Sequence, residues 1–133
     1  MKNQTIISPN PKQILLVDDD ELSLKVLTQY LAEAQYSYVT YKNGQLAWNY
    51  LQQNFDQFFV VFSDRVMPNL NGLQLLAHMQ KKSLNIPLVL FSGEASKEER
   101  CEAIAQGVYD FFYKPISKEL LLAVLNKIKK ELL

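Results

Sequence analysis

The sequence predicts an α/β domain built on a doubly wound, parallel, five-stranded sheet. Two observations lead to this prediction: five short apolar runs recur along the chain, and each is followed by a stretch whose side chains repeat at helical spacing. Strict alternation of strand and helix, written (βα)5, requires right-handed crossover connections. The strands should therefore be parallel, with helices on both faces of the sheet.

The five apolar runs are the expected strands, at residues 14–17, 36–41, 58–62, 86–91 and 109–113. The first, third and fourth runs are almost continuously apolar, which is typical of strands buried on both faces. The stretches after the runs repeat every three or four residues, as Leu22 and Val26 do in the first and Leu121 and Leu125 in the last. These stretches are the expected helices.

Turn-forming residues separate the predicted elements. Asn43-Gly44 precedes the second expected helix, and Asn71-Gly72 lies in the connection before the third. Gly107 follows the fourth expected helix, where a glycine commonly ends a helix. The punctuation agrees with the (βα)5 order.

The organisation of the chain is simple. A length of 133 residues is typical of one domain with a substantial core, which we expect over residues 12–133. Residues 1–11 are polar and contain Pro9 and Pro11, so they are expected to form a flexible leader.

The composition narrows the function. Lys plus Arg and Asp plus Glu both number 14, so the net charge of zero gives no support for bulk attraction to nucleic acid or a membrane. No apolar run approaches the length of a membrane span. The single cysteine, Cys101, excludes an internal disulfide and fits a reducing compartment. A cytoplasmic location is expected.

Polar residues stand where four of the strands end: Asp18-Asp19, Ser63-Asp64, Ser92-Gly93 and Lys114-Pro115. In the flavodoxin-like strand order 2-1-3-4-5, ligands bind beyond the carboxyl ends of the strands, where strands 1 and 3 flank the switch point. Asp18, Asp19 and Asp64 should then share one pocket, with Ser92 and Lys114 along its far side. Clustered carboxylates need a divalent cation, and an all-oxygen site suits Mg²⁺.

The acidic run after the first strand also has a plainer interpretation. Asp20 and Glu21 fit the start of the first helix, where the helix dipole favours negative charge. That interpretation would suffice for the run alone. Asp64 and Lys114 at equivalent strand ends favour a site that includes Asp18.

Four segments together resemble a response-regulator receiver domain, the phosphoacceptor domain of two-component signalling. They are LLVDDDELSLKVL with its acidic pair, FSDRVMPNLNGLQLL around the acceptor aspartate, VLFSG with the hydroxyl, and GVYDFFYKPIS with its Lys-Pro pair. The resemblance covers residues 13–132 in order.

The resemblance implies a role for each residue at the strand ends. Asp64 would be the phosphoacceptor, with Mg²⁺ held by Asp18, Asp19, Asp64 and the backbone carbonyl of Val66. Lys114 would pair with the phosphoryl oxygens, and its bond to Pro115 would be cis.

Four further positions would transmit the change caused by phosphorylation or set how long the phosphoryl group lasts. Ser92 would be the switch hydroxyl and Phe111 the switch aromatic residue. Val66 and Glu94 would flank the phosphoryl group and tune its hydrolysis.

The implied function is signalling rather than metabolic catalysis. The domain would accept a phosphoryl group from a sensor histidine kinase or a histidine phosphotransfer protein, and would catalyse its own phosphorylation and autodephosphorylation. Phosphorylation would then switch protein contacts on the face formed by strand 4, helix 4, strand 5 and helix 5. The unphosphorylated chain is expected to be a monomer, since Val124 stands where paired receivers usually carry Arg. No nucleic acid or membrane partner is expected.

Two other functions fit parts of the sequence less well. An Asp-nucleophile phosphohydrolase would fit Asp18-x-Asp20 after a strand, but Leu22 stands where those enzymes usually have Thr or Val, and no cap domain is visible. A flavin or nucleotide carrier would need a glycine-rich turn after the first strand, which the sequence lacks. His78 and Cys101 are expected on helix surfaces rather than in a catalytic site.

Overall fold

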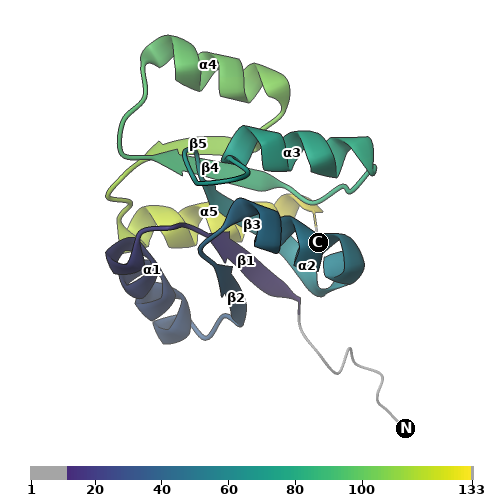
Figure 1. Cartoon of the computed structure of the whole chain (residues 1–133). Helices are drawn as coiled ribbons and strands as arrows, with labels where there is room; N and C mark the ends of the chain where they lie inside the picture. Colours follow the sequence, from purple (N-terminus) through teal and green to yellow (C-terminus); the bar gives the residue numbers. More distant parts are fainter. Residues whose placement is uncertain (1–11, 133) are drawn as a thin grey trace, which may run out of the picture.

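The computed structural model describes residues 12–132, so the leader expected over residues 1–11 lies outside the described residues. A five-stranded sheet forms the centre, in the order β2-β1-β3-β4-β5, and every neighbouring pair is parallel (Figure 1). The strands are β1 (Gln13–Val17), β2 (Tyr38–Tyr41), β3 (Phe58–Asp64), β4 (Leu88–Ser92) and β5 (Asp110–Tyr113). The predicted fold class and strand order are confirmed.

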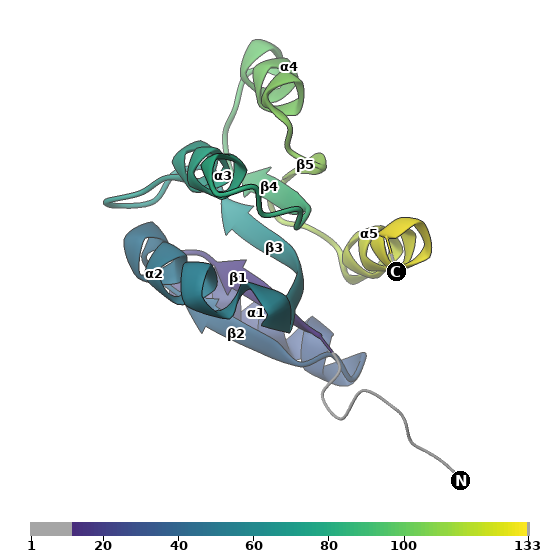
Figure 2. The ribbon, with the colours of Figure 1, turned by 90° about the vertical axis from the view of Figure 1, so that its right-hand side faces the viewer.

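Helices cover both faces of the sheet, as the strand and helix alternation predicts. They are α1 (Glu21–Glu33), α2 (Gly44–Asn54), α3 (Gly72–Lys81), α4 (Lys97–Gln106) and α5 (Lys118–Leu132), with a short 3₁₀ turn η2 (Phe55–Gln57) before β3. Helices α1 and α5 pack on one face, and α2, α3 and α4 on the other (Figure 2). Within residues 12–132, no helix has the length and apolar character that crossing a membrane requires.

Alternation along the strands divides the core into two clusters. In β1, Leu15 and Val17 face the cluster under α2 and α3, whereas Ile14 and Leu16 face the cluster under α1 and α5. Both clusters are apolar, which explains why β1 is a continuous apolar run rather than an alternating one. A charge would therefore be expensive to bury anywhere along β1 except at its end.

Side-chain caps fix where the helices begin. Asp20 caps α1 by accepting a hydrogen bond from the amide of Leu22 at 3.1 Å, as the plainer interpretation of this residue predicted. Asn43, Asn71 and Ser96 cap α2, α3 and α4 in the same way. Gly107 ends α4 in the left-handed conformation, with φ of 116°, which confirms the expected glycine cap.

Two strands run further than their apolar residues suggested. Strand β3 extends to Asp64 and β4 to Ser92, because the polar residues continue the ladder. The amide of Arg65 still donates to the carbonyl of Phe91 at 2.8 Å, and the amide of Lys114 donates to the carbonyl of Ser92 at 2.8 Å. The polar groups at these strand ends are thus held by sheet hydrogen bonds rather than by a loop.

Val124 belongs to the apolar stripe of α5, with Leu121, Leu125 and Ile128. Val124 lies on the inner face of α5 and is only 4% exposed. A buried valine cannot form an ion pair with a second copy of the domain. The expected monomer therefore stays a prediction, based on the missing arginine and the net charge of zero.

Candidate functional site

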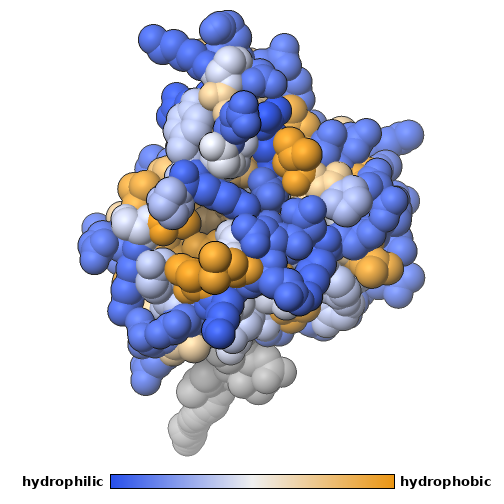
Figure 3. All heavy atoms as spheres, turned by 60° about the vertical axis from the view of Figure 1, so that its left-hand side comes forward, coloured by the Kyte–Doolittle hydropathy of each residue, from blue (hydrophilic) through white to orange (hydrophobic). Residues whose placement is uncertain are grey.

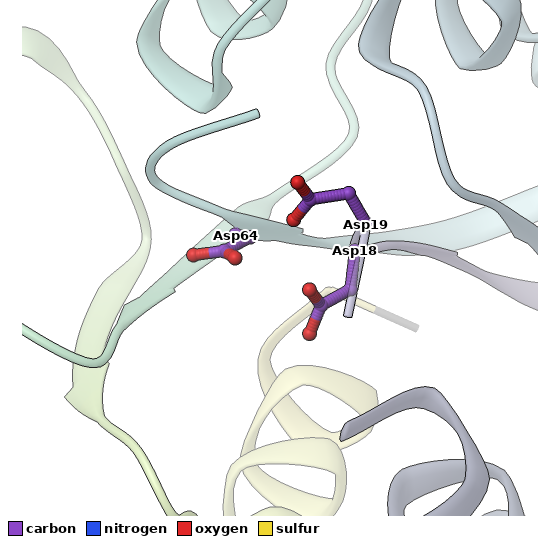
Figure 4. A group of neighbouring side chains, drawn as sticks. All are labelled: Asp18, Asp19 and Asp64. Atoms are coloured by element: carbon purple, nitrogen blue, oxygen red, sulfur yellow. The ribbon is translucent and has the colours of Figure 1, made fainter. Parts of the chain in front are cut away.

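Three carboxylates meet at the carboxyl edge of the sheet. Asp18 follows β1, Asp19 comes next, and Asp64 ends β3; each offers an oxygen, and these oxygens lie within 4.8 Å of one another (Figure 4). Asp18 and Asp64 are buried, whereas Asp19 is exposed. This grouping is the one predicted from neighbouring parallel strands.

A lysine joins the two buried carboxylates. The Nζ of Lys114, just after β5, donates to Oδ2 of Asp18 at 2.9 Å and to Oδ2 of Asp64 at 3.1 Å. The same ammonium group lies 5.2 Å from the ring centroid of Phe91. The bond between Lys114 and Pro115 is cis, as expected. Lys114 is the positive group among the carboxylates.

The electrostatics of the site differ from those of an exposed acid. Burial raises the pKa of Asp64 to about 6; Lys114 opposes this rise and the Asp18 carboxylate adds to it. For Lys114, burial acts to lower the pKa, but hydrogen bonds and charge attraction from Asp18 and Asp64 outweigh it and leave the pKa above its ordinary value. The ammonium group stays charged at neutral pH, while Asp64 is mostly but not wholly ionised.

The donor set fits a hard divalent cation. Every side-chain ligand offered is a carboxylate oxygen, and no thiol or imidazole is among the three residues of the cluster. The second oxygen of Asp18 is already oriented, because Oδ1 accepts a hydrogen bond from the amide of Asp20 at 3.0 Å. The arrangement suits Mg²⁺ better than zinc or copper.

The hydroxyl of Ser92 is engaged away from the carboxylates. Ser92 is buried at the end of β4, and its Oγ donates to the carbonyl of Glu94 at 2.7 Å. The same oxygen accepts from the amide of Glu94 at 3.1 Å and from Nε of Arg65 at 3.3 Å. The hydroxyl thus binds the segment that follows β4.

Phe111 is buried in β5 and is only 2% exposed. Its ring meets the ring of Tyr113 edge-on, with centroids 5.5 Å apart. Tyr113 is 44% exposed, so an aromatic pair connects the core to the surface beside α4.

A wide hollow opens above these groups. It is lined by residues from the ends of β3, β4 and β5, including Asp64, Val66, Ser92, Glu94 and Lys114. Val66 and Glu94 are both exposed, so their side chains stand at the rim of the hollow. The predicted site residues at the ends of these three strands therefore border one space.

Sequence reasoning missed Arg65. Its Nη2 donates to the carbonyl of Glu94 at 2.7 Å, and its Nη1 lies 3.2 Å from Oε2 of Glu99 on α4. The available signal was its place directly after Asp64, at the edge where ligands bind. A charged side chain at that edge is oriented by tertiary contacts, which periodicity does not reveal.

Gly72, the first residue of α3, lies against the backbone at the end of β3. Its amide donates to the carbonyl of Arg65 at 3.2 Å, which brings the start of α3 against the end of β3. A Cβ at this position would lie 2.7 Å from the carbonyl oxygen of Asp64. The helix can approach the strand this closely only because residue 72 has no side chain.

His78 and Cys101 lie outside the site, as predicted. His78 is half-buried on α3, where its ring stacks on that of Trp48 with centroids 5.3 Å apart. Cys101 is exposed on α4. Trp48 itself is buried in the core, not arranged as a base-stacking surface.

Comparison with known proteins gives a consistent result. The family model described as the response regulator receiver domain matches residues 14–126. A cyclic-nucleotide phosphodiesterase, regA of Dictyostelium discoideum, is 34% identical over 117 residues, which cover 86% of this chain and 15% of that protein. The transcriptional regulatory protein GlrR of Escherichia coli is 35% identical over 115 residues, covering 86% of this chain and 26% of that protein. The chain therefore spans only a small part of these relatives.

Among solved structures, the receiver domain of the Francisella response regulator 1452 superposes with a TM-score of 0.81. The two chains are 27% identical, and the match covers 90% of this chain and 98% of that one. The strand order, the acidic cluster and the sequence match all agree with the family that this model describes.

Proposed function

Because the chain belongs to the response regulator receiver domain family, we propose that Asp64 accepts a phosphoryl group from a phosphohistidine. The donor would be a sensor histidine kinase or a histidine phosphotransfer protein, the partners with which receiver domains interact. One observation carries the proposal: the Lys114 ammonium group bridges Asp64 to a second buried carboxylate, Asp18, at the ligand-binding edge of the sheet. The role is that of a signalling module.

Asp64 has the properties of the nucleophile. With a pKa of about 6 it is mainly ionised at neutral pH. Lys114 holds Oδ2, which leaves Oδ1 to attack phosphorus as the bond between phosphorus and the donor imidazole nitrogen breaks. The electron pair of that bond stays on the imidazole. Lys114 then pairs with a phosphoryl oxygen and neutralises part of the added charge.

The acidic cluster supports a metal-assisted reaction. Asp18, Asp19 and Asp64, with the backbone carbonyl of Val66, would hold Mg²⁺. When bound, Mg²⁺ supplies positive charge that stabilises the transferring phosphoryl group. Asp18 keeps its orientation through the amide of Asp20, so the cluster is organised in advance.

The switch would begin at Ser92. To reach a phosphoryl oxygen on Asp64, its hydroxyl must leave the carbonyl of Glu94, which it now contacts. That exchange pulls on the segment between β4 and α4. Phe111 and its neighbour Tyr113 would carry the change to the surface formed by β4, α4, β5 and α5.

The donor would dock beside α1. Figure 3 views the side of the molecule that carries α1, where hydrophobic side chains group among hydrophilic ones. Leu22 and Val26 are 70% and 38% exposed, and with Pro115 and Ile116 they line a hollow of about 290 Å³ that borders Lys114. An amphipathic helix of the donor seated here would lie next to Lys114, which contacts Asp64.

The alternative of an Asp-based phosphohydrolase receives less support. Its second acid would be Asp20, but Asp20 is exposed and occupied in capping α1. Intact mass after incubation with Mg²⁺ and acetyl phosphate separates the two functions. One acid-labile phosphoryl group per chain is expected from a receiver domain, whereas rapid multiple turnover of a generic phosphate ester would favour the hydrolase.

The lifetime of the phosphorylated state should depend on Val66. Hydrolysis needs a water molecule aligned opposite the Asp64 oxygen, and Val66 at the rim of the hollow offers it only methyl groups. Val66→Asn adds a polar side chain that can position the water, so phosphoryl loss should accelerate about three- to tenfold. Decay of the phosphorylated protein after removal of the donor measures the effect.

Leu22→Asn is the matched control for the Val66 variant, because it makes a similarly exposed apolar side chain polar, but one that lines the hollow beside α1. Its decay should equal that of the wild type. Unchanged or slower decay in Val66→Asn would show that Val66 does not limit the attacking water.

A further inference from the structure

Arg65 connects three elements around the proposed switch. Its backbone amide donates to Phe91 on β4, so the residue continues the ladder beyond Asp64. Its side chain is 22% exposed and makes three polar contacts, with Ser92, Glu94 and Glu99. A partly buried guanidinium group with three partners is held more firmly than an ordinary surface arginine.

The contact with Ser92 opposes the movement that the proposed function requires. Nε of Arg65 donates to the Ser92 hydroxyl oxygen at 3.3 Å, whereas the proposed switch needs that hydroxyl at Asp64. Nη2 of the same side chain holds the carbonyl of Glu94, which is also the acceptor for the Ser92 hydroxyl. Arg65 thus stabilises both partners of the hydrogen bond that must break.

Glu99 extends the connection to α4. Its Oε2 lies 3.2 Å from Nη1 of Arg65, and its Oε1 accepts from the amide of Ser96 in the capping box. The segment between β4 and α4 is therefore fixed at both ends by contacts with Arg65. The Glu99 pKa is lowered, first by its hydrogen bonds with Ser96 and then by the Arg65 charge, so the ion pair is present at neutral pH.

We propose that Arg65 is a positioning residue that holds Ser92 and the first turn of α4 in the unphosphorylated arrangement. This inference rests on the proposed function of Asp64 and adds a regulatory element to it. Contacts made in only one state of a two-state switch shift the equilibrium toward that state. Removing the side chain should therefore favour the phosphorylated arrangement.

A different role for Arg65 would change anion binding in the opposite direction. If its guanidinium group instead turned to bind the phosphoryl oxygens, loss of the side chain would weaken anion binding. Loss of a positive charge beside the site would by itself act in the same direction. Tighter binding in an Arg65 variant can therefore come only from release of a restraint.

The test uses beryllofluoride with Mg²⁺, which occupies the phosphoryl position on an aspartate, and follows the Gly93 amide by NMR. Arg65→Met keeps the length and apolar stem of the side chain, and should bind beryllofluoride about five- to tenfold more tightly than the wild type. Arg100→Met is the matched control: Arg100 makes no ion pair within residues 12–132, and its variant should bind like the wild type.

Glu99→Gln distinguishes the specific contact from a general charge effect, because glutamine can still complete the capping box. It should tighten binding in the wild-type background and have no effect in Arg65→Met. If its effect persists in Arg65→Met, the charge of Glu99 acts on the site directly and the proposed connection through Arg65 is overturned.

A second measurement does not depend on phosphorylation. Without metal or beryllofluoride, hydrogen exchange at the amides of Glu94 and Glu99 should be faster in Arg65→Met than in either wild type or Arg100→Met. Equal exchange, or beryllofluoride affinity equal to or below that of the wild type, would overturn the role of Arg65. If the wild type itself does not bind beryllofluoride, the proposed function of Asp64 fails and the regulatory role fails with it, even where the exchange result shows that Arg65 restrains the segment.

Discussion

Asp64→Asn is expected to lower phosphorylation by a small phosphodonor about a thousandfold or more, because a neutral amide is a poor nucleophile toward phosphorus. Intact mass spectrometry after incubation with Mg²⁺ and acetyl phosphate measures the change. The loss will not reflect unfolding. The substitution removes a carboxylate whose burial raises its pKa to about 6, so the variant should melt no lower than the wild type in metal-free buffer.

The matched control for this variant is Asp20→Asn. Asp20 is a neighbouring exposed carboxylate that caps α1, and asparagine caps a helix equally well. It should therefore be phosphorylated like the wild type. Stable labelling of Asp64→Asn at another aspartate or at His78 would refute Asp64 as the acceptor.

Mg²⁺ is expected to stabilise the folded protein at neutral pH. At a concentration ten times its dissociation constant, mass action adds about 1.4 kcal/mol to the free energy of unfolding, a rise in melting temperature of roughly 5 °C. Asp19→Ala should lose most of this shift and should be at least as stable as the wild type without metal, because it relieves repulsion with Asp18 and Asp64. Thermal melts with and without Mg²⁺ measure both effects.

The stabilisation by Mg²⁺ should depend on pH. The native pKa of Asp64, about 6, lies above its ordinary value, so in metal-free buffer the native state holds more protons than the unfolded state between about pH 4 and 6. The contribution of Asp64 to stability is therefore present at low pH and is lost as the pH rises through 6. Mg²⁺ must displace that proton, so its shift should be smaller at pH 5 than at pH 7.5.

Asp56→Ala is the control for the metal titration, since Asp56 is exposed on η2, before β3 begins. Its Mg²⁺ dependence should match that of the wild type. If Mg²⁺ raises the melting temperature equally in Asp19→Ala and Asp56→Ala, or equally at both pH values, the three carboxylates are not the Mg²⁺ site.

The sequence was sufficient to group the charged site residues because parallel strands place their carboxyl ends at one edge. Asp18, Asp64 and Lys114 each follow an apolar run, so the strand order alone brings them together. No long-range contact had to be known in advance. The fold class could be predicted for the same reason, since a parallel sheet satisfies the strict alternation of strand and helix.

What sequence reasoning could not supply was the direction of side chains. Ser92 was placed correctly along the site, yet its hydroxyl turns to Glu94 and Arg65, a choice made by local geometry after the sheet has formed. The first helix shows the same limit: the spacing of Leu22 and Val26 predicted a helix, but these side chains are 70% and 38% exposed, and other leucines form the buried face. Rotamers and helix rotation depend on packing, which a one-dimensional pattern does not contain.

The missing side chain of Gly72 limits how the site can vary. A Cβ there would come within 2.4 Å of Cδ1 of Leu90, which can turn aside, and within 2.7 Å of the Asp64 carbonyl oxygen, which cannot, because it belongs to the strand backbone. Even alanine would push α3 outward or tilt the end of β3, and the Asp64 carboxylate would move with it. Val66 and Glu94, at the rim of the hollow, are exposed, so other side chains fit there without moving the backbone. Position 72 does not allow such changes, because α3 can approach the end of β3 only where no side chain stands between them.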